Sequence, residues 1–394
     1  MSADIFNPTQ EHSMLREMVR DFAKSAVEPQ AAQYDREEKF NVELFRNLGE
    51  LGLLGITVSE EYGGAGMDAT AAVIAHEELA AVDPGFCLAY LAHAMLCVNN
   101  FYVNANEEQK QQLLPKMCSG EFVGAMGMSE PDAGTDVLGM SSTAVLKGND
   151  YILNGRKMWI TNGCIDDEGT ACDGVLVYAK TGSSQNLSTF MVLKEHKGFS
   201  VGQKIKDKLG MRASNTAELV FEDCQVPKSW LIGEEGDSMK HMMRNLEIER
   251  LTLAAMSLGI ARRSLEIMVK YASEREAFKL PLNRFGQIQK YIGDSYAEFK
   301  AARAYVYQTA QKLGPSGSGE RVDSDGVKLF ASTMGKNVSD RAIQVLGGYG
   351  YVGEYTVERL WRDAKLLEIG GGTIEAHQKN ITRDLSKNPV LIDR

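Results

Sequence analysis

The change of periodicity along this 394-residue chain constrains its fold more than any other feature. Residues 122–235 contain short runs rich in Val, Ile, Tyr, Phe and Thr, such as DYILNG, GVLVYAKT and LSTFMVL, with glycine and asparagine between them. These runs predict β-strands, and no helical pattern separates one from the next. Strands that follow one another without helices predict a small antiparallel barrel or sandwich.

Helical periodicity dominates on both sides of this region. Residues 1–121 contain stretches such as MLREMVRDFAKSAV, in which apolar residues recur at positions i, i+3, i+4 and i+7. Residues 236–394 contain long patterns of the same kind at about 238–272, 283–312, 322–346 and 355–386. Long helices joined by short loops predict a four-helix bundle. The sequence therefore predicts an α+β protein with an N-terminal helical domain (1–121), a middle β-domain (122–235) and a C-terminal bundle (236–394).

Composition and charge argue against several classes of protein. The formal net charge of −10 makes nucleic acid an unexpected partner, because phosphate backbones are bound by clustered lysine and arginine. The six cysteines form no CxxC pair and the six histidines form no HxH or HExxH motif, so neither disulfides nor a metal site is expected. No apolar run reaches the roughly 18 to 20 residues that cross a bilayer, and the acidic N-terminus fits neither a signal nor a transit peptide. We expect a soluble protein of the bacterial cytoplasm or, after removal of a transit peptide, the mitochondrial matrix.

The segment LLEIGGGTIEAH interrupts the last helical pattern with three consecutive glycines, Gly370 to Gly372. Each glycine costs roughly 1 kcal/mol relative to alanine inside a helix, so the run needs an explanation. One explanation is a break, in which glycine ends one helix and Thr373 caps the next. The local sequence alone does not distinguish this break from a functional role of the glycines.

The first bundle helix carries Glu249 in the middle of an apolar stripe formed by Met242, Leu246, Leu253, Met256 and Ile260. Glu249 has no lysine or arginine three or four residues away along the helix. Glu247 has Arg244 and Arg250 three residues to either side and is interpreted as a solvated ion pair. Burial would raise the pKa of Glu249, as a general base near neutrality requires. A carboxylate at a packing edge, or one paired with another subunit, would explain the same pattern.

Two segments of the β-region could bind a cofactor. In GMSEPDAGTDV, small residues and turn formers could present backbone N–H groups and the Thr135 hydroxyl to an anion such as a pyrophosphate. MWITNG places Trp159 and Thr161 on one face of a strand, where the indole could cover an aromatic ring. An ordinary surface turn and core packing are the alternatives. A GxGxxG fingerprint is absent, which argues against a Rossmann nucleotide site.

Six motifs in order resemble those of the acyl-CoA dehydrogenase family: GMSEPDAGTD, NGRKMWITNG, DKLGMRASNTAELVFEDCQVP, REAF, QVLGGYGY and RDAKLLEIGGGT. The resemblance covers essentially the whole chain. It implies the family fold of an N-terminal helical domain, a middle β-domain and a C-terminal four-helix bundle. It also implies FAD as cofactor, an acyl-CoA as substrate, a homotetramer, and an electron-transfer flavoprotein as electron acceptor.

The resemblance also gives the glycines a meaning. In many family members the position of Gly371 holds the glutamate that removes the substrate α-proton. Isovaleryl-CoA dehydrogenases and some long-chain members lack it and carry the base on a bundle helix, in a motif that matches LEIERL and thus Glu249. The backbone N–H of Gly371 and a flavin ribityl hydroxyl would stabilise enolate charge on the thioester oxygen, and Arg250 would contact CoA.

The similarity to isovaleryl-CoA dehydrogenases also implies a reaction. Isovaleryl-CoA would become 3-methylcrotonyl-CoA, a step of leucine catabolism, as Glu249 abstracts the C2 proton and hydride leaves C3 for the flavin. Matched residue by residue, the family's flavin contacts in one subunit are Met128, Ser129, Thr135, Trp159, Thr161 and Thr373. Those from a neighbouring subunit are Arg275, Phe278, Gln344 and Gly348.

Several departures from the family pattern touch the neighbour's contacts. Lys279 replaces the family glycine after REAF, and the glutamine usually near Gly286 is displaced to Gln287 or Gln289. GGNG has become GGYG at 347–350. The loop at 165–174 is also longer than its equivalent in relatives.

Other functions of the same fold stay open, namely another short-chain acyl-CoA dehydrogenase, a glutaryl-CoA dehydrogenase, a desulfinase and an acyl-CoA oxidase. A glutaryl-CoA dehydrogenase or a desulfinase needs a cation for the distal acid group. Between Thr70 and Glu121 the only basic residues apart from histidine are Lys110 and Lys116, which argues against an acidic acyl chain. A flavin-free binding or scaffolding relative is the alternative from another class.

Overall fold

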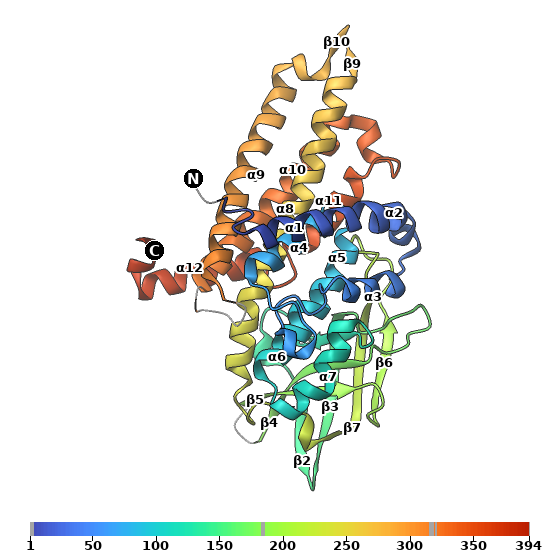
Figure 1. Ribbon diagram of the computed structural model, residues 1–394, viewed down its shortest axis with the longest axis vertical. Coiled ribbons are helices and arrows are strands. Elements are labelled where there is room, and N and C mark those ends of the chain that lie inside the picture. The colour runs from blue at the N-terminus through green and yellow to red at the C-terminus, as the bar shows by residue number, and fades with distance from the viewer. Residues whose placement is uncertain (1–3, 183–185, 315–318, 320, 394) are drawn as a thin grey trace.

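The computed structural model describes residues 4–182, 186–314, 319 and 321–393. A β-sheet forms one end of the molecule, and two long helices, α8 (Ser238–Glu274) and α9 (Gly286–Lys312), form the other (Figure 1). The N-terminal helices lie across the middle and contact both parts. The predicted fold class, with helical N- and C-terminal regions and a β-region between them, is confirmed.

The N-terminal region is built from short helices. They are α1 (Gln10–Phe22), α2 (Glu28–Glu37), α3 (Val42–Glu50), α4 (Ala69–Ala80), α5 (Pro84–Leu91), α6 (Asn100–Asn104) and α7 (Glu107–Ser119). π-Helical segments join α1 to α2 at Ala23–Val27 and α5 to α6 at Ala92–Asn99. Polar residues cap several of them, as where the Asp68 carboxylate accepts a hydrogen bond from Ala71 N (2.9 Å) at the start of α4.

The continuous helical segment Pro84–Asn104 is long and apolar enough to cross a membrane, although no such segment was expected from the sequence. It is the only one of its kind in the described part of the chain. However, 83% of its most apolar window is buried inside the protein, and every residue of α5 is buried. The apolar composition therefore follows from burial on all sides, as in the core helix of a larger protein.

The middle region forms one eight-stranded sheet with the order β6-β7-β3-β2-β4-β5-β8, and β1 pairs with β4 off this path. The strands are β1 (Gly124–Gly127), β2 (Thr143–Lys147), β3 (Asp150–Thr161), β4 (Gly174–Thr181), β5 (Asn186–Leu193), β6 (Phe199–Lys204), β7 (Thr216–Pro227) and β8 (Leu231–Ile232). β1 and β2 pair with β4 in parallel, and the other neighbours are antiparallel. The sheet is thus mixed rather than purely antiparallel, because neither β1 nor β2 reaches β4 through a hairpin turn.

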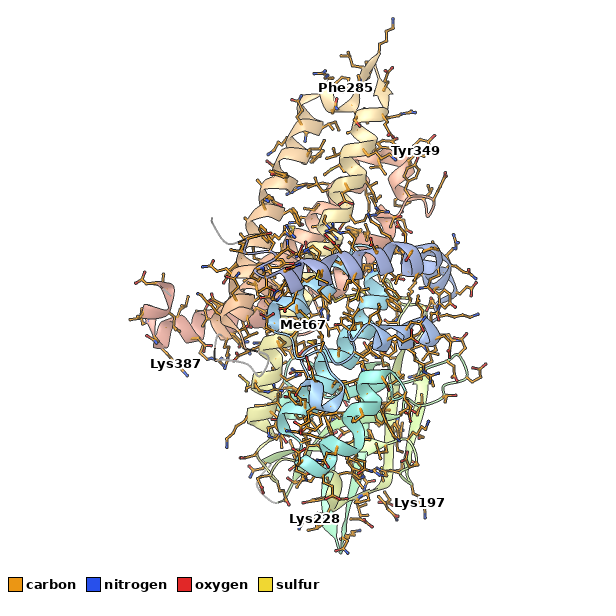
Figure 2. All side chains as sticks on the ribbon, in the orientation of Figure 1. Met67, Lys197, Lys228, Phe285, Tyr349 and Lys387 are labelled. Carbon is orange, nitrogen blue, oxygen red and sulfur yellow. The ribbon has the colours of Figure 1, made fainter. Side chains whose placement is uncertain are left out.

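The C-terminal region contains the predicted long helices. After α8 and α9 come α10 (Arg321–Leu346), α11 (Val357–Leu367) and α12 (Ile374–Lys387), and α10 contacts all four of the others. A two-stranded hairpin of β9 (Glu276–Ala277) and β10 (Leu280–Pro281) joins α8 to α9 at the tip of the molecule (Figure 1). Phe285 lies at this tip, and Tyr349 lies below it on the same end of the molecule (Figure 2).

α4 and α8 approach each other closely through small side chains. Every residue of α4 is buried, and a Cβ atom at Gly259 of α8 would lie only 2.4 Å from Glu77 O. Any side chain at residue 259 would therefore separate the two helices. This contact fixes the N-terminal helices against the part of α8 that follows Glu249.

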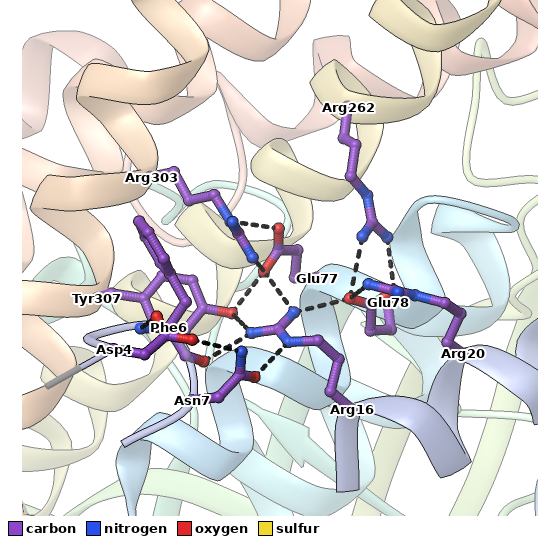
Figure 3. Close-up of polar contacts among 10 residues, drawn as sticks. All are labelled: Asp4, Phe6, Asn7, Arg16, Arg20, Glu77, Glu78, Arg262, Arg303 and Tyr307. Atoms are coloured by element: carbon purple, nitrogen blue, oxygen red, sulfur yellow. Dashed lines mark hydrogen bonds and ion pairs between the residues drawn. The ribbon is translucent and has the colours of Figure 1, made fainter. Parts of the chain in front are cut away.

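A buried ion-pair network connects α4 to α1, α8 and α9 (Figure 3). Arg16 of α1 donates hydrogen bonds to Glu77 (3.1 Å) and Glu78 (2.7 Å) of α4. Further partners of the two carboxylates come from α1, α8 and α9, and they are Arg20, Arg262, Arg303 and Tyr307. Burial alone would raise the pKa of Glu78, but hydrogen bonds from Arg262 and two other arginines lower it to about 2. The network therefore holds an ionised carboxylate where these helices meet.

Glu247 is not the solvated ion pair that the sequence analysis proposed. It is buried, and its Oε2 accepts a hydrogen bond from Gly319 N (3.1 Å). Gly319, two residues before the start of α10, thus contacts this part of α8. Local sequence does not reveal that contact, because the two groups are 72 residues apart.

Candidate active site

Glu249 lies in the first third of α8, in a part of the helix that is buried. Its side chain is 7% exposed, and Oε2 has no hydrogen-bond partner among the described residues. Burial raises the pKa of Glu249 to about 6, although the charges of Arg250 and Lys328 oppose this effect. A carboxylate with this pKa is ionised at neutral pH and has an unpaired oxygen that can take up a proton.

The three glycines form the loop between α11 and α12. Gly371 and Gly372 have φ angles of 66° and 99°, in the left-handed region that favours glycine. Thr373 Oγ1 accepts a hydrogen bond from Ala376 N (3.2 Å) at the start of α12. The predicted helix break and the predicted cap at Thr373 are therefore both confirmed.

This loop places Gly371 directly beside Glu249. A Cβ atom at Gly371 would lie 3.3 Å from Glu249 Oε1 and 2.2 Å from Leu253 Cδ1. The N–H of Gly371 has no hydrogen-bond acceptor in the described part of the chain. A proton acceptor and an unpaired main-chain donor thus lie side by side, and a donor of this kind stabilises negative charge that develops on a substrate oxygen.

Arg250, the residue after Glu249, is also buried. Its Nη1 pairs with Asp325 Oδ1 of α10 (3.1 Å), and its Nε has no partner among the described residues. The expected contact of Arg250 with CoA stays a prediction. Within the protein, Arg250 joins α8 to α10 next to Glu249.

Several of the predicted flavin contacts lie together at the sheet. Lys157 Nζ donates a hydrogen bond to Met128 O (3.1 Å), and Met158 N donates one to Ser129 O (2.9 Å). Met128 and Ser129 are thereby held against β3, immediately before Trp159. Lys157 also pairs with Glu130 (2.8 Å), so a third residue of this turn is held against β3.

Glu130 organises this turn further. Its carboxylate accepts hydrogen bonds from Ser141 N and from Ser142 N (3.0 Å) as well as from Lys157. Burial alone would raise the pKa of Glu130, but these hydrogen bonds lower it to about 2. Thr135, another predicted flavin contact, lies exposed in the same turn.

Trp159 has an unusual backbone conformation at this place. Its φ angle is 66°, and β3 changes register with β7 between Lys157 and Ile160. A bulky residue in the left-handed region is strained, and such strain is concentrated at functional sites. The bulge leaves the indole 63% exposed while Ile160 points into the core. Thr161 is half-buried on the same strand.

The remaining predicted flavin contacts lie in another part of the molecule. Phe278, at the tip of the β9–β10 hairpin, is 90% exposed. Gln344 and Gly348 are exposed at the end of α10, where Gly348 and Arg275 line a shallow pocket with Tyr349. The tip is at the opposite end from the sheet (Figure 1). One chain therefore does not bring its two sets of predicted flavin contacts together.

Family models of the acyl-CoA dehydrogenases match three successive parts of the chain. The N-terminal domain model matches residues 9–121, the middle domain model 125–224 and the C-terminal domain model 236–386. The chain belongs to the acyl-CoA dehydrogenase family. It is accordingly an oxidoreductase, and members of this family depend on FAD.

This acyl-CoA dehydrogenase is similar to proteins named for different substrates. It is 41% identical over 391 residues to mitochondrial isovaleryl-CoA dehydrogenase of Oryza sativa subsp. japonica, which covers 98% of this chain and 93% of the relative. It is 40% identical over 376 residues to a short-chain-specific acyl-CoA dehydrogenase of Clostridium acetobutylicum, which covers 95% of this chain and 97% of the relative. The crystal structure of an acyl-CoA dehydrogenase complexed with FAD from Bacillus anthracis matches with a TM-score of 0.90 at 32% identity, over 97% of this chain and 68% of that chain.

Three buried residues of this acyl-CoA dehydrogenase contact the glycine loop or its supports but were not identified from the sequence. They are Asp325 and Lys328 of α10 and His377 of α12. Only the position of Lys328 is unusual in the sequence. It stands in a stripe of small and apolar residues at steps of three and four, namely Ser324, Ala331, Gly335 and Val338. The criterion that selected Glu249 on α8 would still have passed over Lys328, because Asp325 lies three residues before it and offers a partner along the helix.

Proposed function

We propose that this enzyme catalyses the FAD-dependent α,β-dehydrogenation of a short branched acyl-CoA, namely isovaleryl-CoA to 3-methylcrotonyl-CoA. The observation that supports this proposal most directly is the pair formed by Glu249 and Gly371. A vacant side-chain position at 371 lies within 3.3 Å of a carboxylate supplied by a different helix. This is the arrangement expected of a family member in which α8, and not the loop, carries the catalytic base.

Glu249 takes the proton from C2 of the acyl chain in this proposal. Its pKa of about 6 keeps it ionised at neutral pH, and burial makes the unpaired Oε2 a stronger base than an exposed carboxylate would be. The N–H of Gly371 donates a hydrogen bond to the thioester oxygen as negative charge develops there. Because the donor belongs to the main chain, the change from glutamate to glycine at 371 leaves it intact.

The residues at the sheet fit a flavin. Trp159 offers an exposed indole at a strained bulge, and Glu130 and Lys157 hold Met128 and Ser129 beside it. FAD, when bound, accepts the hydrogen and electron pair that leave C3 of the substrate. Met128, Ser129, Thr135, Trp159, Thr161 and Thr373 would hold it in one subunit. Thr373 would do so while its hydroxyl caps α12.

The tip residues support a neighbouring subunit as the second part of the cofactor site. Phe278 is almost fully exposed in the β9–β10 hairpin, which lies at the opposite end from the sheet (Figure 1), and Arg275 directly precedes this hairpin. Gln344 is in the last turn of α10, and Gly348 directly precedes Tyr349, which lies on the same end of the molecule as the hairpin (Figure 2). An exposed aromatic residue of this kind is typical of an interface. We propose a homotetramer in which these residues complete a neighbour's FAD site, and an electron-transfer flavoprotein as electron acceptor. Light scattering that shows a flavin-loaded monomer would contradict the shared site.

One observation favours a second candidate, an acyl chain with an acidic end. The guanidinium of Arg244 on α8 contacts Asn99 Oδ1 (3.3 Å), yet its Nε and Nη2 are buried without a partner among the described residues. Burial lowers the pKa of Arg244 to about 10, which is consistent with unsatisfied charge. A substrate carboxylate would satisfy both donors. Arg244 lies outside residues 70–121, the region in which a cation for such a substrate was expected.

A panel of acyl-CoA substrates with an artificial electron acceptor tests the proposal. We expect a higher kcat/KM with isovaleryl-CoA than with butyryl-, octanoyl- or glutaryl-CoA, and one methylene is worth about 10- to 200-fold. Equal or better turnover of octanoyl-CoA would contradict the short branched substrate, and preference for glutaryl-CoA would favour the second candidate. A colourless preparation that stays inactive with added FAD would instead indicate a flavin-free relative.

A further inference from the structure

Two buried side chains contact carbonyl groups on the two sides of Gly371, those of Leu367 and Gly372. Lys328 Nζ donates hydrogen bonds to Leu367 O, at the end of α11, and to Gly372 O (3.4 Å). His377 Nε2 donates to the same Gly372 O (3.0 Å) from the first turn of α12. Lys328 and His377 are both fully buried, so water does not replace these donors in the folded protein.

His377 is itself fixed from the other side. Its Nδ1 lies 2.6 Å from Asp325 Oδ1, and the same oxygen pairs with Arg250 Nη1 (3.1 Å). His377 thus lies between two hydrogen-bond acceptors, the Asp325 carboxylate and the Gly372 carbonyl group. A continuous chain of contacts therefore runs from Arg250, the neighbour of the base, through Asp325 and His377 to the glycine loop.

These contacts hold the loop on both sides of Gly371. Glycine has the widest choice of backbone conformations of any residue, so three in succession would otherwise leave the position of the Gly371 N–H poorly defined. With the Leu367 and Gly372 carbonyl groups fixed, the loop keeps the φ angle of 66° at Gly371 that sets it beside Glu249.

We propose that Lys328 and His377 are positioning residues that hold the glycine loop, and that Lys328 also sets the charge environment of the base. The inference rests on the proposed roles of Glu249 and the Gly371 N–H. Neither residue is proposed to touch the substrate. Both act through the main chain of the loop.

The charges around Glu249 make the second role of Lys328 testable. The charged or titratable groups that influence Glu249 are Arg250 on its own helix, Lys328 on α10 and the Tyr178 hydroxyl on β4. Lys328 donates to Gly372 O, and the adjacent Gly371 lies beside Glu249, so the positive charge of Lys328 lies near the base and lowers its pKa against the effect of burial. Removal of that charge should therefore raise the pKa of the base, and a residue with only a packing role would not have this effect.

Hydrogen exchange of the FAD-loaded enzyme without substrate tests the positioning role independently of turnover. In Lys328→Met, the hydrogen-bonded amides at the two ends of the loop, Gly370 N (to Leu366 O) and Ile374 N (to Glu368 O), should exchange at least about tenfold faster than in the wild type, because the anchor of the loop is lost. Lys328→Arg keeps a donor for both carbonyl groups and should restore much of the protection. His377→Leu should show the same faster exchange, and it carries the test alone if Lys328→Met does not fold.

Lys208→Met is the matched control. Lys208 is a buried lysine that also donates to main-chain carbonyl groups, Met211 O (2.9 Å) and Ser214 O (2.6 Å), and burial lowers its pKa to about 8, as it does for Lys328. Its loss should destabilise the protein without faster exchange of the Gly370 and Ile374 amides. Equal protection of these amides in Lys328→Met, His377→Leu and the wild type would overturn the proposal.

Steady-state kinetics provide the second readout. Lys328→Met should lower kcat by about 10- to 100-fold with little change in KM, because misplaced catalytic groups affect the transition state most. The acidic limb of its kcat/KM profile should move to higher pH, and Lys328→Arg should move it back. An acidic limb at the same pH in Lys328→Met and the wild type would overturn the electrostatic role of Lys328. A wild type inactive on every acyl-CoA would contradict the proposed function, while the exchange experiment would still decide whether the loop is held.

Discussion

Replacement of Glu249 by glutamine should lower turnover and raise the stability of the folded protein. Glutamine keeps the size of the side chain but cannot take up a proton, so we expect Glu249→Gln to bind FAD and acyl-CoA and to lose turnover. Loss of a general base costs typically about 10²- to 10⁴-fold in rate. The same change removes a buried carboxylate whose Oε2 has no partner, so the folded protein should become more stable.

The size and pH dependence of this stabilisation follow from the pKa of Glu249. Its value rises from 4.5 to about 6 on folding, and this difference corresponds to about 2 kcal/mol. A raised carboxyl pKa means that the folded protein holds the proton more tightly than the unfolded chain. The wild type therefore loses stability as the pH rises from about 4.5 through about 6. Glu249→Gln should match the wild type below pH 4.5 and exceed it by up to about 2 kcal/mol above pH 6.

Thermal melting of both FAD-loaded proteins at a series of pH values measures the difference, and the acceptor-linked assay measures turnover. Glu247→Gln is the control, because Glu247 is equally buried on the same helix but accepts a hydrogen bond from Gly319 N. It should keep most of the turnover. If Glu249→Gln retained more than about a tenth of wild-type kcat, well above the expectation for a lost general base, Glu249 would not be the base.

The double change Glu249→Gly with Gly371→Glu tests whether the old position of the base still functions. The structure predicts poor rescue. A side chain at 371 must accept a φ angle of 66° and would meet Leu253 Cδ1 at 2.2 Å from its Cβ. The conformation alone costs of order 1–3 kcal/mol. Partial recovery of turnover would show that the loop adapts, and its absence would not affect the assignment from the single variant.

Two further predictions concern stability. Lys279 has a φ angle of 67° in the two-residue turn between β9 and β10, where turns with two positive φ angles favour glycine, so Lys279→Gly should raise the free energy of unfolding by roughly 1 kcal/mol in urea titrations. A lower midpoint with an unchanged slope would refute this reading of the turn. Glu78→Gln would leave Arg16, Arg20 and Arg262 facing a neutral amide, so it should cost about 3–5 kcal/mol in the same experiment. A cost below about 1 kcal/mol, as for an exposed ion pair, would show that the network is hydrated.

Periodicity alone predicted the main features of this protein. Helical and strand patterns have different repeats, and each repeat is a property of neighbouring residues, so the order of helical, β and helical regions was readable before any contact was known. The break at Gly370–Gly372 and the cap at Thr373 are equally local. Glu249 was identifiable because an unpaired carboxylate on an apolar stripe is unusual at any position in a helix.

The tertiary structure decided which distant groups meet. Gly371 lies beside Glu249, and Lys328 reaches Leu367 O across 39 residues. Glu247 accepts a hydrogen bond from Gly319 N, and β1 and β2 lie parallel to β4. These contacts depend on how whole helices and strands pack, and the free energy of that packing is shared among many residues far apart in the chain. The sequence by itself thus determined which residues were unusual, and only the packing of α8, α10 and the glycine loop decided that they form one site.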